Sequence, residues 1–102
     1  MTDETELLPW DAAAVLDTPE AQEEFLIAAF ETEDPRFIAR SLGTIARARN
    51  ISQIARDSGM TRAALYRAFR GQTRPEFATI LKILRALNIG LVPVIRKADE
   101  PA

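Results

Sequence analysis

The chain has 102 residues, of which 47% are hydrophobic and 27% charged, proportions typical of one soluble domain. It has no cysteine and no histidine, which excludes disulfides, thiolate or imidazole metal sites, and catalysis by either side chain. Adjacent acids such as Glu23 and Glu24 diverge on a helix and form no evident acid–base dyad. We therefore expect a non-enzymatic single domain over residues 1–102, without metal, cofactor or small-molecule substrate.

The net charge of −2 conceals a strong segregation of charge along the chain. Residues 1–34 contain eleven acids and no lysine or arginine, whereas residues 35–74 contain nine arginines and a single acid, Asp57. Such separation of acidic from basic residues indicates two different binding partners, or an acidic part of the chain that screens the charge of the basic part.

No apolar run approaches the roughly 20 residues that a membrane span requires. The acidic N-terminus also lacks the basic start and apolar stretch of a signal peptide. The sequence therefore predicts a cytoplasmic protein with no membrane partner.

The first half of the chain carries three helix signals. A short helix is expected over residues 11–16, with Trp10 as its apolar anchor. Thr18-Pro19 and Asp34-Pro35 each combine a capping side chain with proline at the first helical position, so we expect helices from there to about Phe30 and about Arg49. Their predicted buried faces are Phe25, Leu26, Ala29 and Phe30 in the first, and Phe37, Ile38, Leu42, Ile45 and Ala46 in the second. Gly43 weakens the second helix by about 1 kcal/mol relative to alanine but would permit close packing.

Two short helices and a longer one follow. Ser52 is expected to cap a helix through Ser58, and Thr61 to cap a helix that ends near Gly71, with a turn at Gly59-Met60 between them. Pro75 begins a last helix to Leu87, ended by Asn88 and Gly90. Its predicted inward residues are Phe77, Ile80, Leu81, Ile83 and Leu84.

The C-terminal region, residues 91–102, begins with an extended, β-branched run. Residues 91–95 are predicted to form a short edge strand, because Pro93 cannot donate in the middle of a sheet. This run and Trp10 are candidate dimer contacts or parts of the core. We expect an all-α fold of five or six helices, with an acidic segment at 1–34 and a core at 35–90.

The stretch from Ile51 to Phe69 has the spacing of a helix-turn-helix. Ala55 is small enough for close crossing, Gly59 can adopt a positive φ in the turn, and Met60 fills the angle between the helices. Leu65 and Phe69 are expected to face the core, opposite Ile54.

An α-helix turns by about 100° per residue, which places the arginine side chains of the second helix on one outer arc of about 140°. Their guanidinium groups offer forked pairs of N–H donors. These are the groups that a helix in the DNA major groove requires. Arg62 is the predicted base reader, Ala63 a thymine-methyl contact, and Thr61 and Ser52 phosphate contacts at the helix N-termini. The full set of candidate DNA-binding residues is Ser52, Gln53, Thr61, Arg62, Ala63, Tyr66, Arg67, Arg70 and Arg74. Arg67, Arg70 and Arg74 are expected phosphate contacts, and the alternative for each is a solvated side chain. The alternative for the whole motif is a helical hairpin with a solvated basic face.

These segments resemble the antidote proteins of bacterial toxin–antitoxin modules, in the HigA-like branch of the Xre/lambda-repressor class. The resemblance spans about Trp10 to Ile95 and lies in WDAAAVLDTPE, EFLIAAF, SLGTIARARN, SQIARDSG, LYRAF-RG and PEFATILKILRALNIGL. Many Xre proteins hold a phosphate with a glutamine at the position of Ile51, so this role does not pass directly to Gln53. The resemblance implies an Xre-like bundle.

The resemblance also implies two activities. One is neutralisation of a basic toxin of the RelE/HigB kind, and the other is repression of the protein's own operon, as a homodimer on a palindromic operator. The acidic N-terminal segment would complement a basic toxin, with candidate contacts at Trp10, Asp11, Glu20, Glu23, Glu24 and Glu31. Two alternatives remain: these acids form only a solvated face that aids solubility, or the protein is a stand-alone phage-type repressor without a toxin.

Overall fold

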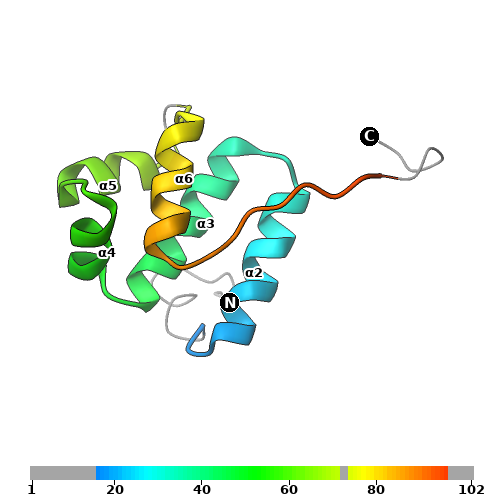
Figure 1. Ribbon diagram of the computed structural model, residues 1–102, viewed down its shortest axis with the longest axis horizontal. Coiled ribbons are helices and arrows are strands. Elements are labelled where there is room, and N and C mark those ends of the chain that lie inside the picture. The colour runs from blue at the N-terminus through cyan, green and yellow to red at the C-terminus, as the bar shows by residue number, and fades with distance from the viewer. Residues whose placement is uncertain (1–15, 72–73, 97–102) are drawn as a thin grey trace, which may run out of the picture.

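The computed structural model describes residues 16–71 and 74–96, and within these ranges it contains helices and no strand. The chain order is α2 (Pro19–Glu31), α3 (Pro35–Ala48), α4 (Ile51–Ser58), α5 (Arg62–Phe69) and α6 (Phe77–Ala86). α3 packs against α2 on one side and against α4 and α5 on the other, and α6 packs on α4 (Figure 1). The helix expected over residues 11–16 lies outside the described residues, apart from Leu16.

Local capping determines where most helices begin. Thr18 Oγ1 accepts a hydrogen bond from the Ala21 amide at 3.1 Å, and Asp34 Oδ1 accepts one from the Arg36 amide at 3.0 Å. A proline occupies the start of both helices, as the sequence predicted. Thr61 Oγ1 caps α5 by accepting from the Ala64 amide at 3.0 Å.

The predicted cap of α4 was wrong by two residues. Asn50, and not Ser52, is the N-cap, because its Oδ1 accepts from the Gln53 amide at 3.1 Å. Ser52 therefore lies inside the first turn of α4. Asparagine is among the strongest N-cap residues, and Asn50 already precedes the apolar Ile51 in sequence.

The core surrounds α3. Leu42 and Ile45 are fully buried, together with Leu65 of α5 and the α6 residues Ile83 and Leu84. α5 approaches α3 closely at Gly43, where an added Cβ would lie 2.8 Å from Cβ of Phe69. The predicted close packing at this glycine is confirmed.

The predicted apolar faces were too wide in three places. Phe77 is 67% exposed, Leu81 is 36% exposed and Phe37 is 37% exposed. α6 begins at Phe77 rather than Pro75, so Phe77 lies in the first turn, beyond the part of α6 that packs on the core. Ile80, Ile83 and Leu84 form the narrower buried stripe.

The predicted edge strand at residues 91–95 is not formed. α6 ends at Ala86, Asn88 two residues later adopts φ 61°, and the chain then runs past α2 as an irregular segment (Figure 1). A strand needs a neighbour for its ladder, and the described part of the chain offers none. The segment is instead linked to the end of α2 by an ion pair between Arg96 and Glu33.

Candidate nucleic-acid and protein interfaces

A tight turn sets the orientation of α5 relative to α4. Gly59 adopts φ 73°, a conformation that glycine reaches without steric cost, and the Met60 amide donates to the Ala55 carbonyl at 3.2 Å. Leu65 and Phe69 are buried on the inner side of α5 and Ile54 on the facing side of α4. The inner contacts predicted for this helix pair are confirmed, and they leave the opposite side of α5 exposed.

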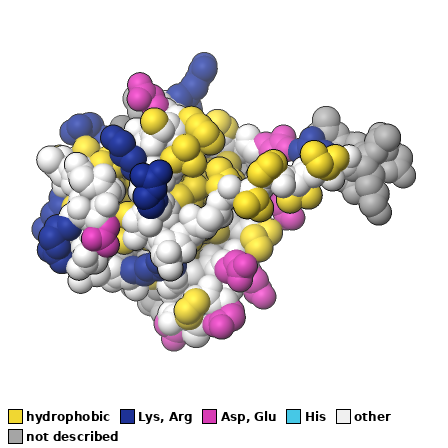
Figure 2. Space-filling view, viewed as in Figure 1, with side chains coloured by type: hydrophobic (Ala, Val, Ile, Leu, Met, Phe, Trp, Pro, Cys, Tyr) yellow, Lys and Arg dark blue, Asp and Glu magenta, His cyan; other side chains and the backbone are white. Residues whose placement is uncertain are grey.

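The outer side of α5 carries the predicted arc. Arg62, Ala63, Arg67 and Arg70 are exposed, and Tyr66 is half-buried between this arc and the core. In the space-filling view the basic side chains gather mainly over the α4–α5 end of the molecule (Figure 2). Among the described residues, no carboxylate pairs with the arginines of α5. Arg74, just before α6, is also exposed.

The N-termini of α4 and α5 differ in what they offer a phosphate. Thr61 accepts a hydrogen bond as the cap of α5, and its hydroxyl proton remains available to donate outward. Gln53 is exposed, but its amide group bonds to Asp57 at 2.8 Å and to Arg56 at 2.7 Å. This chain of side chains along α4 was missed by sequence reasoning, although the three residues stand at helical i, i+3 and i+4 spacing. Ser52 is half-buried.

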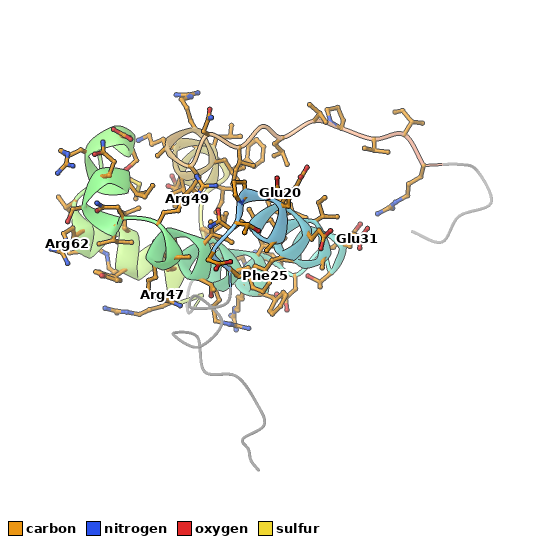
Figure 3. The ribbon with its side chains drawn as sticks, turned by 90° about the horizontal axis from the view of Figure 1, so that it is seen from below. Glu20, Phe25, Glu31, Arg47, Arg49 and Arg62 are labelled. Atoms are coloured by element: carbon orange, nitrogen blue, oxygen red, sulfur yellow. The ribbon has the colours of Figure 1, made fainter. Side chains whose placement is uncertain are left out.

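The acidic candidates form a separate surface on α2. Glu20, Glu23, Glu24 and Glu31 are all exposed on this helix. Figure 3 places Glu31 and Arg62 at opposite ends of the molecule. The described residues 16–34 hold seven acids and no base, and the structure brings Arg49 to Gln22 and Arg96 to Glu33 at the edges of this region. Trp10 and Asp11 lie outside the described residues.

A groove of about 920 Å³ lies between α2 and the C-terminal segment, residues 88–96. Its apolar walls come from both elements: Leu26, Ile27 and Phe30 on α2, and Leu91, Val92 and Val94 on the segment. Sequence reasoning missed this groove because Ile27 falls outside the predicted buried face of α2 and Val94 was expected in a strand.

The described residues were also compared with the requirements of a metal site and of a membrane-spanning helix. They contain no group of three or more possible metal-ligating side chains. No helix in the described ranges combines the length and apolar character needed to cross a membrane.

Comparison with known proteins gives the family. A family model described as "probable addiction module antidote protein" matches residues 6–95. The chain belongs to this antidote family. An uncharacterized protein of Haemophilus influenzae is 42% identical over 84 residues, which cover 82% of this chain and 87% of that protein. No solved structure matches the chain. The predicted resemblance to antidote proteins is therefore confirmed, and membership in the antidote family supports an antitoxin role.

Proposed function

We propose that this protein is the antitoxin of a type II toxin–antitoxin module, in the HigA-like branch of the Xre class. It neutralises a RelE/HigB-like toxin in the cytoplasm and represses its own operon as a homodimer on a palindromic operator. The observation that carries the proposal is the pairing of antidote-family membership with an exposed arginine face on α5. The protein acts by binding and not by catalysis.

In the DNA-binding half of the proposal, α4 and α5 act as a helix-turn-helix and α5 enters the major groove. Arg62, in the first turn of α5, offers a forked pair of donors to the O6 and N7 of a guanine. Ala63 beside it is small enough to meet a thymine methyl group. Tyr66, half-buried, contacts DNA with its exposed edge.

Phosphate contacts position the helix on the duplex. Arg67, Arg70 and Arg74 supply charge along the exposed side, and each contact releases counterions. The Thr61 hydroxyl donates a hydrogen bond to a phosphate at the start of α5. The Ser52 hydroxyl and the Gln53 amide group donate to a phosphate at the start of α4. Because Gln53 is already bonded to Asp57 and Arg56, its contribution requires that network to open.

In the toxin-binding half, the acidic surface of α2 meets a basic toxin. Toxins that bind RNA carry basic surfaces, and opposite charge speeds association and orients the two proteins. The separation of α2 from the arginines of α5 supports binding of toxin and DNA at the same time (Figure 3).

Co-purification with the adjacent gene product tests the proposal. We expect a tagged copy to retain a basic protein of about 100 residues encoded beside it, and to shift DNA from the upstream promoter in a mobility assay. A chain that shifts promoter DNA but binds no such neighbour would favour the stand-alone repressor. A folded chain that binds neither partner would reject both functions.

A further inference from the structure

We propose that the groove between α2 and residues 88–96 receives an apolar segment of a basic protein partner. This inference rests on the proposed function, in which that partner is the toxin, and it adds an apolar docking site to the acidic surface of α2. The groove has a volume of about 920 Å³.

The walls of the groove expose large apolar side chains. Ile27 on α2 is 51% exposed and Val94 on the segment is 83% exposed, and both line the groove. Figure 2 shows apolar side chains continuing along the C-terminal segment. A contiguous apolar surface in a small protein is typical of an interaction site, because leaving it in water is costly.

Polar contacts hold the two walls in place. Arg49, which lines the groove, donates to the Gln22 side chain of α2 at 2.9 Å and to the carbonyl of Leu87 at the end of α6. At the other end, Arg96 pairs with Glu33. Arg49 therefore fixes the end of the groove where the segment leaves α6, which lowers the entropic cost of binding there, whereas the exposed Arg96–Glu33 pair adds little at the far end.

Charge selects the occupant. Three acids, Glu23, Glu31 and Glu33, and two bases, Arg49 and Arg96, line the groove, so its own lining is net acidic, and the described residues 16–34 add four further acids without a base. Residues 1–15 of the same chain contain four acids and no base, so they suit this groove poorly. In a two-fold interface with a second copy, the same acidic patch would face itself. A basic partner has neither problem.

The position of the groove also suits a protein partner. The C-terminal segment leaves α6 and runs across α2, away from α5 (Figures 1 and 3). A partner seated there leaves the outer face of α5 accessible, so the docked complex retains its arginines for DNA.

Two matched pairs of acidic substitutions test the site against the purified product of the adjacent toxin gene. Ile27→Asp and Val94→Asp place a charge in the groove, and Ala28→Asp and Ile95→Asp place the same charge on exposed neighbours that do not line it. We expect the dissociation constant by calorimetry to rise about tenfold or more for the first pair and less than about twofold for the second. An added acid alone would favour a basic partner, so loss of affinity reports apolar burial.

The outcomes separate the two proposals. If the unsubstituted chain fails to bind the toxin, the proposed function fails. If it binds and all four variants bind alike, only the groove assignment is overturned. As a second measurement that does not depend on variant stability, a photo-reactive residue replacing Val94 should cross-link to the toxin, and one replacing Ile95 should not. Cross-links from position 94 to residues 1–15 or to a second copy would overturn the proposal.

Discussion

The Arg49 guanidinium donates a hydrogen bond to the Gln22 side-chain oxygen at 2.9 Å, and the two residues stand 27 positions apart in the chain. Gln22 is 7% exposed and donates in turn to the carbonyl of Leu16 at 2.9 Å. Arg49 also donates to the carbonyl of Leu87, one of the acceptors left unpaired at the end of α6. One pair of side chains therefore joins α2, the end of α3 and the end of α6 (Figure 3).

Replacing Gln22 tests this junction. Gln22→Leu keeps the side chain's bulk but leaves the buried Leu16 carbonyl and Arg49 without their partner, and we expect a loss of about 1–3 kcal/mol in the free energy of unfolding. Urea denaturation measures the loss. Glu23→Gln, at the exposed neighbouring position, should change stability by less than about 0.5 kcal/mol. Equal stability of the two variants would show that the junction does not stabilise the fold.

Gly43→Ala is expected to destabilise the protein although alanine favours a helix by about 1 kcal/mol over glycine. The added methyl group would lie 2.8 Å from Cβ of Phe69, and overpacking of this kind costs about 1–3 kcal/mol. Gly90→Ala is the control, because a Cβ there meets nothing within 4 Å. Thermal unfolding compares the two variants. A Gly43→Ala protein that melts higher than the parent would contradict the close approach of α5 to α3.

The position of the α4 cap can be tested with a matched pair. Asn50→Ala removes the acceptor for the Gln53 amide and should cost about 0.5–2 kcal/mol of stability. Ser52→Ala should cost little, since Ser52 is not the cap. If Ser52→Ala lost more stability than Asn50→Ala in denaturant unfolding, Ser52 and not Asn50 would be the cap. Operator binding is measured in parallel, because Ser52 is also a candidate phosphate contact.

Arg62→Ala should weaken operator binding by about 1–3 kcal/mol while the protein stays folded, because Arg62 is the proposed base reader. Arg85→Ala, an exposed arginine of α6 away from the proposed reading face, is the control. Fluorescence anisotropy with the promoter fragment gives both affinities. Unchanged affinity in a folded Arg62→Ala protein would remove Arg62 from the base-reading role.

Arg70→Ala should instead reduce the dependence of binding on salt. If Arg70 holds one phosphate, the slope of log K against log salt concentration should fall in magnitude by about one. Titrations of parent and variant at several salt concentrations give this slope. An unchanged slope would indicate that Arg70 is solvated in the complex.

The sequence predictions were most accurate for features that depend on residues close together in the chain. Thr18, Asp34 and Thr61 cap helices as expected, because a cap depends on residues within one turn. The exposed arc of α5 was also predicted, since helical periodicity separates Arg62 and Arg67 from Leu65 and Phe69. The exposure of Phe77 was not predicted, because periodicity identifies the apolar side of a helix without showing how much of that side a neighbouring helix covers.

The sequence by itself determined the helical class, most helix starts, the charge segregation and the resemblance to antidote proteins. Each of these depends on residue type and on spacing within a few turns. Only the tertiary structure decided that residues 91–96 lie beside α2 without forming a strand, and that Arg49 joins three helices. Those features arise from contacts between positions 27 to 63 residues apart, and no local pattern in the sequence specifies such contacts.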